Sequence, residues 1–203
     1  MLLIKSKSKI AKRLGARIFE QTQTQKFALS EARSKKQKRG RRGGSDYGLQ
    51  LLEKQRVRFT YGISERQLAN YARKAFEKKD PAAALHRALE MRIDAASYAA
   101  GFALTRRAAR QMTSHGHLTV NGKRTRIPSY RVQKGDVIAV REGSRNSPLF
   151  SKLNEEMTDS PRIVPAWLKV EGPLMRAHVV GEPAYTRGES SLDYGTVFEF
   201  YSR

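Results

Sequence analysis

The sequence predicts an α+β protein in which helices precede a small antiparallel sheet. Three observations predict this class. Apolar side chains recur at helical spacing in successive segments between residues 46 and 115. After Gly116 the spacing of apolar side chains changes from about 3.6 residues to about 2, which is typical of strands. Residues 1–58 hold 17 basic and 4 acidic side chains, so a basic N-terminal extension is expected ahead of the helices.

The first two predicted helices have recognisable starts. We expect Asp46 to cap a helix that ends before Gly62. Ser64, with Gln67 three residues later, forms a capping-box pattern that predicts the start of the second helix. Apolar residues in this helix recur at the spacing of a single helical face, which predicts that the face is buried. They are Leu68, Tyr71, Ala72, Ala75 and Phe76.

Three more helices are predicted before the sheet. Asp80 and Pro81 supply an N-cap and a first-turn residue for the first of them. The next is expected over residues 93–102. The last covers residues 105–114, and Gly116 is a typical C-terminal stop.

The sheet is predicted from alternation and from turn signals. Leu118 and Val120 alternate with polar neighbours, as in a half-buried strand. Asn121–Gly122 then supplies the signal of a type I′ hairpin. We expect the return strand to end at Ile127–Pro128, and a further strand over residues 137–140.

The remainder of the chain is expected to form a short helix from Pro148 through Met157 and two strands, over residues 167–170 and 197–201. We divide the sequence into four parts. They are a basic N-terminal extension (1–44), a small helical domain that the C-terminal end joins (45–91), a domain of helices packed on a small antiparallel sheet (92–155) and a C-terminal segment that completes the fold (156–203).

The composition narrows the class of partner. The chain has 203 residues, a net charge of +21 at pH 7 and no cysteine. Such a charge repels itself, so a polyanion is the expected partner, with nucleic acid first and an anionic membrane second. The lack of cysteine excludes disulfide frameworks, thiolate zinc sites and thiol nucleophiles. The longest near-apolar run, residues 95–104, is far shorter than the ~18 residues of a spanning helix, so no membrane span is expected.

The densest positive charge lies in residues 34–44, SKKQKRGRRGG, which contain no apolar side chain. Alone, this run has nothing to bury and is expected to be disordered. We interpret it as an arm that folds against phosphates, and a solvated tail is the alternative. Its cationic residues are Lys35, Lys36, Lys38, Arg39, Arg41 and Arg42.

A second basic surface is predicted on the helix after Thr105. The polar arc of its helical wheel contains Arg106, Arg107, Arg110, Thr113 and Ser114. Nothing acidic lies on that helix, so we expect a cationic face that no carboxylate neutralises. A second group of cations follows just past the turn: His115, His117, Lys123, Arg124 and Arg126. A helix and a hairpin joined by a short turn place both groups on one rim, where guanidinium groups suit phosphates. A solvated basic face is the alternative.

Residues 105–142, TRRAARQMTSHGHLTVNGKRTRIPSYRVQKGDVIAVRE, resemble the alpha-L RNA-binding motif of several translation and RNA-modification proteins. Residues 45–75, SDYGLQLLEKQRVRFTYGISERQLANYARKA, are more specific and resemble the small ribosomal subunit protein four family of bacteria and organelles. The closing stretches AWLKVEG (166–172) and VFEFYSR (197–203) resemble that family's C-terminal end. The resemblance runs in order over most of the chain.

The resemblance implies a structural constituent of the small ribosomal subunit that binds small-subunit ribosomal RNA, nucleates assembly of the 5′ domain and contributes to translational accuracy. The partners that it implies are small-subunit protein five, other ribosomal proteins, and mRNA near the channel through which mRNA enters. It also implies a location on cytoplasmic or organellar ribosomes. No cofactor and no membrane partner are expected. The RNA-facing residues that it implies in the helical part are Tyr47, Lys54, Arg56, Arg58 and Arg66. Those in the alpha-L part are Arg106, Arg107, Arg110, His115, Lys123, Arg124 and Arg126.

Other readings have less support. Some relatives hold zinc through N-terminal cysteines, but this chain has none, and His115 and His117 have no evident third ligand, so no metal site is expected. Enzymes with alpha-L motifs need a catalytic domain, and the remaining sequence contains no catalytic motif, so no enzymatic activity is expected. A free alpha-L-type RNA-binding stress factor or RNA-modification-associated factor is the alternative function, although it would not need residues 45–75.

Overall fold

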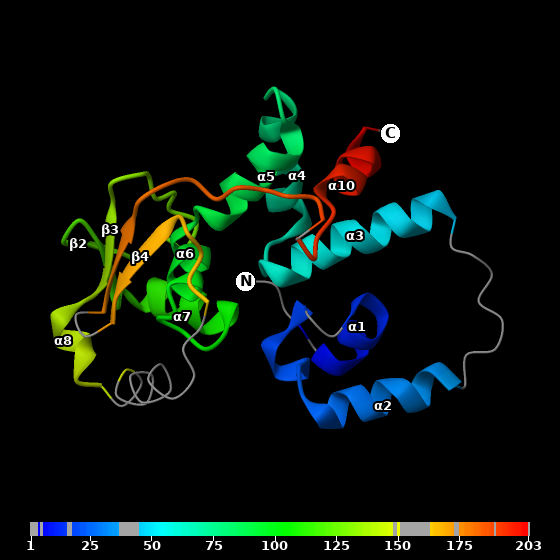
Figure 1. The fold of residues 1–203 in the computed structure, drawn as a ribbon, viewed down its shortest axis with the longest axis horizontal. Helices are drawn as coiled ribbons and strands as arrows, with labels where there is room; N and C mark the ends of the chain where they lie inside the picture. Colours follow the sequence, from blue (N-terminus) through cyan, green and yellow to red (C-terminus); the bar gives the residue numbers. More distant parts are fainter. Residues whose placement is uncertain are drawn as a thin grey trace. The chain divides into compact units, whose positions relative to one another are not determined.

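The computed structural model describes residues 4, 6–15, 18–36, 45–147, 150, 163–172, 175–188 and 190–202 (Figure 1). The chain forms two compact units. We call residues 1–85 with 185–203 the helical unit, and residues 86–184 the sheet unit. The α+β class predicted from the sequence is confirmed, because helices precede an antiparallel sheet of five strands in the described part of the chain.

The helical unit begins with α1 (Lys7–Leu14), the short 3-10 helix η2 (Glu20–Thr22) and α2 (Gln25–Lys36). These elements enclose a small core of their own, because their apolar side chains pack together and against Leu52 and Phe59 of the following helix. The buried members are Ala11, Leu14, Ile18, Phe19 and Phe27. The predicted disorder of residues 34–44 is wrong for residues 34–36, which continue α2. The other eight residues of that run lie outside the described ranges.

The next two helices, α3 (Asp46–Thr60) and α4 (Glu65–Phe76), start close to the predicted positions. The N-cap of α3 is Ser45 rather than Asp46, since its hydroxyl accepts a hydrogen bond from the Gly48 amide at 3.2 Å. The capping box of Ser64 and Gln67 at the start of α4 is confirmed. Its predicted buried face is confirmed at three positions, Leu68, Ala72 and Ala75. Tyr71 is half-buried, and Phe76 is 58% exposed.

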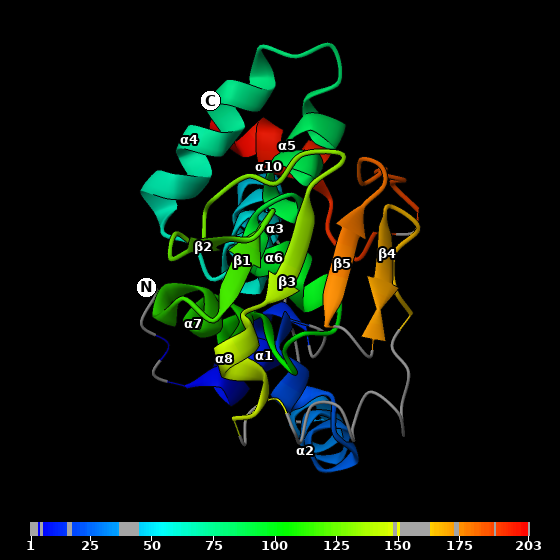
Figure 2. The same ribbon diagram turned by 90° about the vertical axis from the view of Figure 1, so that its left-hand side faces the viewer.

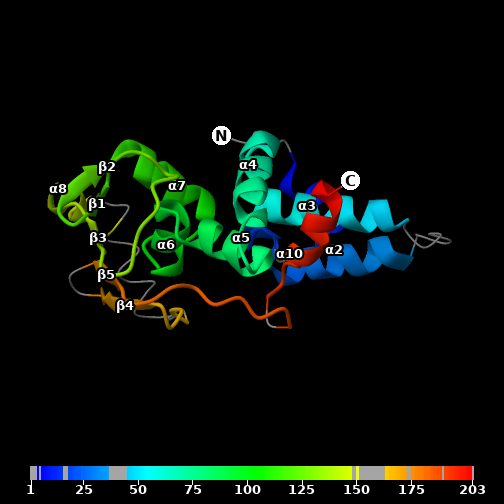
Figure 3. The same ribbon diagram turned by 90° about the horizontal axis from the view of Figure 1, so that it is seen from above.

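The last element of the helical unit is α10 (Tyr194–Tyr201), where the sequence predicts a strand over residues 197–201. That prediction is wrong because Asp193 caps a helix: its carboxylate accepts hydrogen bonds from the amides of Gly195 and Thr196. α10 lies beside α3 and α4, so the C-terminal end of the chain packs on helices from its first half (Figures 1 and 3). The hydroxyl oxygens of Tyr61 and Tyr194 are 3.0 Å apart in the buried contact.

The sheet unit receives the second half of α5 (Pro81–Glu90) and contains α6 (Ile93–Ala99) and α7 (Arg106–His115). Their starts follow from local sequence. Asp80 accepts a hydrogen bond from the Ala83 amide at 3.1 Å, and Thr105 accepts one from the Ala108 amide at 3.1 Å. Gly116 ends α7 with a φ of 75°, the left-handed conformation that glycine adopts without strain.

The sheet is antiparallel throughout, with strand order β2-β1-β3-β5-β4 (Figure 2). Its strands are β1 (Leu118–Val120), β2 (Lys123–Thr125), β3 (Val137–Val140), β4 (Leu168–Glu171) and β5 (Arg176–Val179). Asn121 and Gly122 have φ values of 50° and 78°, which confirms the predicted hairpin turn. The predicted strands over 137–140 and 167–170 are confirmed, whereas β5 was not predicted.

One face of the sheet forms the core of its unit. Leu118, Val120, Ile138 and Val140 are buried on that face with Ala177. Side chains of α6 and α7 belong to the same core, and α6 lies behind the sheet in Figure 2. A short helix, α8 (Glu142–Arg145), follows β3. The helix predicted from Pro148 through Met157 lies outside the described residues except Phe150, which is buried in this core.

Across the described ranges, none of the helices is both long enough and apolar enough to cross a membrane.

Candidate nucleic-acid interface

Two of the three arginines on α7 are neutralised by carboxylates from earlier elements. Nη2 of Arg106 is 3.1 Å from Oε1 of Glu90, and its guanidinium lies over the Tyr98 ring at 4.8 Å. Nη1 of Arg110 is 3.3 Å from Oδ2 of Asp94. The expectation of an unneutralised face is therefore wrong at these two positions. The acidic partners lie 16 residues earlier in the chain, where a helical wheel of α7 does not show them.

The exposed part of α7 is narrower than the predicted arc. Arg107 is exposed and has no ion pair within the described part of the chain, and Ser114 and His115 are exposed beside the C-terminal end of the helix. Thr113, predicted on the polar arc, is fully buried, and its hydroxyl donates a hydrogen bond to the Ala109 carbonyl at 2.9 Å. Arg107 is thus the α7 arginine that remains available to an anionic partner.

The hairpin of β1 and β2 brings further cations to the end of α7. Nε of Arg124 donates to the Gly116 carbonyl at 2.9 Å, and Nη2 donates to the His115 carbonyl at 3.0 Å. These bonds hold the hairpin against the C-terminal end of α7, which is the arrangement that the predicted rim assumes. We call the exposed cationic and titratable residues of α7 and the hairpin the basic rim. They are Arg107, His115, Lys123, Arg124 and Arg126.

Positive charge is crowded around the basic rim. Burial, followed by the proximity of His115, Arg141 and Arg124, lowers the pKa of His117 below its ordinary value. Partial desolvation, followed by Arg126 and Arg141, likewise lowers the pKa of Arg124. Nδ1 of His117 is 3.0 Å from the Ser144 hydroxyl, and its ring centroid is 6.0 Å from that of His115. The rim therefore presents concentrated positive charge beside imidazoles, a surface suited to polyanions.

The predicted residues of the helical unit are divided between structural contacts and the surface. Lys54 is buried, with Nζ 3.0 Å from Oε1 of Glu65 and 4.0 Å from the centroid of the Phe200 ring. Arg58 also faces Glu65, at 3.7 Å. Lys54 is thus occupied by the packing of the unit, and Arg58 takes part in the same group of charges.

The other three predicted residues of this unit differ. Nε of Arg56 donates to the Leu14 carbonyl at 2.6 Å, and its guanidinium also pairs with Glu53. Tyr47 is 49% exposed, with its ring centroid 5.7 Å from that of Phe200. Arg66 is exposed on α4 and has no ion pair with any residue that the structure describes. Tyr47 and Arg66 are the most accessible of the five.

Few of the cations predicted in residues 34–44 lie within the described ranges. Lys35 and Lys36 form the last turn of α2, and their side chains are not described. The remaining predicted cations of the run lie outside the described ranges: Lys38, Arg39, Arg41 and Arg42. Where the structure assigns positions, His, Asp and Glu side chains do not gather in groups of three that would hold a metal ion.

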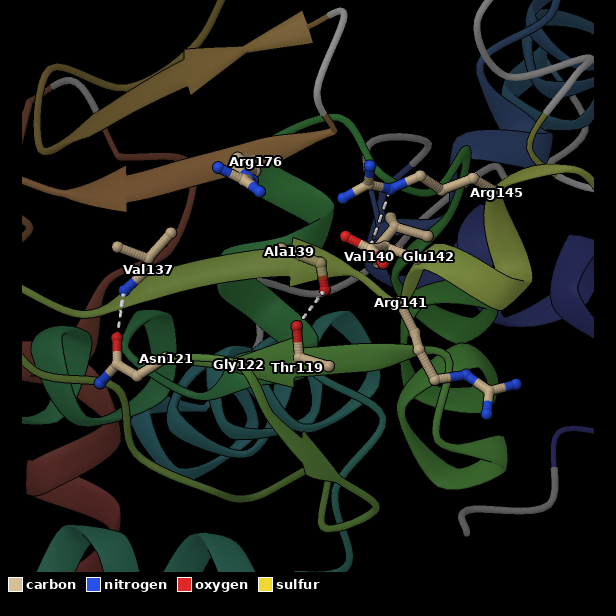
Figure 4. A pocket seen from close by; sticks show the side chains of 10 residues that line it. All are labelled: Thr119, Asn121, Gly122, Val137, Ala139, Val140, Arg141, Glu142, Arg145 and Arg176. Atoms are coloured by element: carbon tan, nitrogen blue, oxygen red, sulfur yellow. Dashed lines mark hydrogen bonds between the residues drawn. The ribbon is translucent and has the colours of Figure 1, made fainter.

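Three arginines that sequence reasoning did not select border a hollow on the outer face of the sheet: Arg141, Arg145 and Arg176 (Figure 4). Arg141 follows directly on the predicted strand, so its position at the strand end was a usable signal. Arg176 lies on β5, a strand that the sequence did not reveal, and so it had no predicted neighbours.

Comparisons with known proteins match most of the chain. The profile of the family described as "Ribosomal protein S4/S9 N-terminal domain" matches residues 3–90, and the profile of the "S4 domain" matches residues 91–138. A "Small ribosomal subunit protein uS4" from Roseiflexus sp. (strain RS-1) is 44% identical over 168 residues, covering 80% of each chain. The same-named protein of Pelotomaculum thermopropionicum is 44% identical over 167 residues, covering 81% of this chain and 78% of that one. That of Mycobacterium avium (strain 104) is 44% identical over 160 residues, covering 78% and 79%.

Proposed function

The chain belongs to the family of small ribosomal subunit protein uS4, and we propose on this basis that it is a structural component of the small ribosomal subunit that binds its ribosomal RNA. The observation that carries the RNA-binding part is the basic rim. Its cations come from α7 and from a hairpin that Arg124 holds against the C-terminal end of that helix, and in the described structure none of them is paired with a carboxylate. A pre-positioned group of guanidinium, ammonium and imidazole side chains suits the phosphates of folded RNA.

The paired and unpaired arginines of α7 have different roles in this proposal. Arg106 and Arg110 form ion pairs with Glu90 and Asp94, and these pairs hold α7 against α5 and α6. Arg107, one helical position away from Arg106, has its charge available to solvent. We assign Arg106 and Arg110 to positioning the rim and Arg107 to contacting RNA.

Finer roles extend this proposal. The family resemblance favours early binding to the 5′ domain of the small-subunit RNA, contact with small-subunit protein five, a contribution to translational accuracy and a position near the channel by which mRNA enters. The residues 37–44, with four cations and no apolar side chain, suit a phosphate-binding arm. The role is structural rather than catalytic, on cytoplasmic or organellar ribosomes.

Sedimentation of a cell lysate tests the ribosomal role. The protein is expected to migrate with small subunits at low and high magnesium, and to leave them only in stripping salt. Recovery with membranes, or in the slowly sedimenting fraction at all magnesium concentrations, would contradict it.

Binding to purified small-subunit RNA tests the electrostatic mechanism. Each phosphate that the protein neutralises adds roughly −0.7 to −0.9 to the slope of log affinity against log salt. A steep slope is expected for the wild type, and Arg107→Gln with Lys123→Gln is expected to make it shallower. A wild-type slope near zero would contradict the mechanism.

A further inference from the structure

The outer face of the sheet is hollowed between β1 and β3. Thr119 of β1 pairs with Ala139 of β3, and these small side chains form the floor, while long side chains stand at the margin (Figure 4). The space measures about 570 Å³. Three arginines line it, Arg141, Arg145 and Arg176, and Figure 4 shows the side chain of Arg141 extending from the end of β3 away from the other two. The alternation of the strands explains the shape, because the large apolar residues of β1 and β3 point to the opposite, buried face.

The described lining of this hollow carries a net positive charge. Glu142 is the single carboxylate that lines it, against the three guanidiniums. None of the three arginines forms an ion pair with a residue in the described ranges, unlike Arg106 and Arg110 on α7. Each of the two on the helix side uses one donor on the protein: Nε of Arg145 donates to the Val140 carbonyl at 3.2 Å, and Nε of Arg141 to the Ser144 hydroxyl at 3.3 Å. These bonds orient the planar groups and leave their terminal N–H donors available.

The hollow adjoins the basic rim. The backbone amide of Arg141 donates to the His117 carbonyl at 2.8 Å, directly behind the hairpin. Arg141 is also close enough to Arg124 and His117 to lower the pKa of both groups. Arg141 thus connects the hollow to the basic rim.

We propose that the hollow between β1, β3 and β5 binds the sugar-phosphate backbone of RNA through Arg141, Arg145 and Arg176, as a second contact surface beside the basic rim. The inference rests on the proposed RNA-binding function and extends it to residues outside the rim. Guanidinium forks bind phosphate oxygens in pairs, and the three arginines lie at an open surface rather than an enclosed cavity. The lining contains no aromatic side chain on which a base would stack, so backbone contact fits better than base recognition.

Hydroxyl-radical footprinting of the full-length protein on small-subunit ribosomal RNA tests this proposal. The test variant is Arg141→Gln with Arg176→Gln, since both side chains are exposed. The matched control is Lys78→Gln with Lys79→Gln, which removes the same charge from an exposed stretch of the helical unit. The test variant is expected to lose protection of at least one backbone stretch and to reduce the salt slope by roughly 1.4 to 1.8, as for two lost phosphates, while the control keeps the wild-type footprint.

Several outcomes would overturn the proposal. An unchanged footprint and slope in the test variant would show that the hollow does not contact RNA, and an equal loss in both variants would show a general charge effect. Unchanged RNA binding with reduced retention of another ribosomal protein would assign the hollow to a protein partner. If the wild type itself protects no ribosomal RNA, the proposed function fails, a result distinct from the other three.

A second variant keeps the test valid if the glutamine pair lowers the thermal midpoint. Arg141→Lys with Arg176→Lys retains both charges and removes the planar forks. It is expected to restore the salt slope but not the full protection, and wild-type protection by this variant would contradict a requirement for guanidinium forks.

Discussion

Arg92 and Asp94 form a bidentate ion pair inside the sheet unit, with Nε 2.9 Å from Oδ1 and Nη2 2.6 Å from Oδ2. Both side chains are almost completely buried. The same Asp94 carboxylate lies 3.3 Å from Nη1 of Arg110 on α7, so one acid serves two guanidinium groups. This shared carboxylate links the start of α6 to the helix that carries the basic rim.

Removing the shared carboxylate is expected to be strongly destabilising. Asp94→Asn removes the carboxylate charge that faces the buried Arg92 guanidinium, and breaking such a pair costs about 3–5 kcal/mol of unfolding free energy. Urea denaturation of the full chain measures the loss. Glu142→Gln, at an exposed site without an ion pair in the described structure, is the control and should change the unfolding free energy by less than about 0.5 kcal/mol. Similar values for the two variants would contradict the structural role of Asp94.

The arginines of α7 are expected to separate stability from binding. Arg110→Ala should lower the unfolding free energy by about 1–3 kcal/mol, because it removes a largely buried partner of Asp94. Arg107→Ala should leave stability nearly unchanged and weaken binding to small-subunit RNA. Denaturation and RNA binding, measured on both variants, check this. Equal stability of the two variants would mean that the Arg110 pair contributes little.

Gly116 is expected to tolerate no side chain. Its φ is 75°, and a Cβ at this position would overlap the guanidinium of Arg124. Gly116→Ala should therefore cost about 1–3 kcal/mol from backbone strain, and it should also weaken RNA binding by displacing Arg124. Gly143→Ala is the matched control, because its φ is ordinary and a Cβ there meets nothing within 4 Å. A stable Gly116→Ala variant with wild-type affinity would show that Arg124 need not hold this position.

The packing of the last helix is expected to depend on Glu65. This carboxylate accepts a hydrogen bond from the Tyr201 hydroxyl at 2.8 Å and lies 3.0 Å from the buried Lys54 ammonium. Burial, followed by the hydrogen bond to Glu65, raises the pKa of Tyr201. Glu65→Gln should cost about 1–3 kcal/mol of unfolding free energy, because Lys54 loses its counter-charge. The exposed Glu77→Gln is the control for denaturation measurements, and a loss no larger than its own would refute the role of Glu65.

Acidification is expected to destabilise the sheet unit through two histidines. Burial is the main cause that lowers the pKa of both His86 and His117. The unfolded chain therefore binds more protons than the folded one as the pH falls through about 6.5, so this stability is present above that pH and lost below it. The thermal midpoint should fall between about pH 7.5 and about pH 5.5, and less steeply for His86→Gln with His117→Gln. Parallel profiles for the two proteins would assign the pH dependence to other groups.

Local signals in the sequence predicted the elements whose ends depend on their own residues. The capping box at Ser64, the glycine stop at Gly116 and the Asn121–Gly122 hairpin are all confirmed, because each depends on contacts within a few residues. The pairing of Arg106 with Glu90 depends on how α7 packs against α5, and no local pattern contains that information.

Two segments were predicted wrongly from the sequence. The alternation VFEFY suggested a strand over residues 197–201, but the cap at Asp193 and the helices beneath it stabilise α10. Near the start of the chain, the high charge predicted a basic extension ahead of the helices, whereas α1 and α2 form there, with Leu14 and Ile18 in a buried apolar face. The partners that bury that face, Leu52 and Phe59, lie on α3, more than thirty residues later.

The position of α10 affects the order in which the two units can fold during synthesis. Every residue of the sheet unit is made before Tyr185, whereas the helical unit draws on both ends of the polypeptide. A nascent chain can therefore complete its antiparallel sheet before α10, which packs on α3 and α4, has been synthesised. Completion of the helical unit therefore requires the chain to be synthesised through α10.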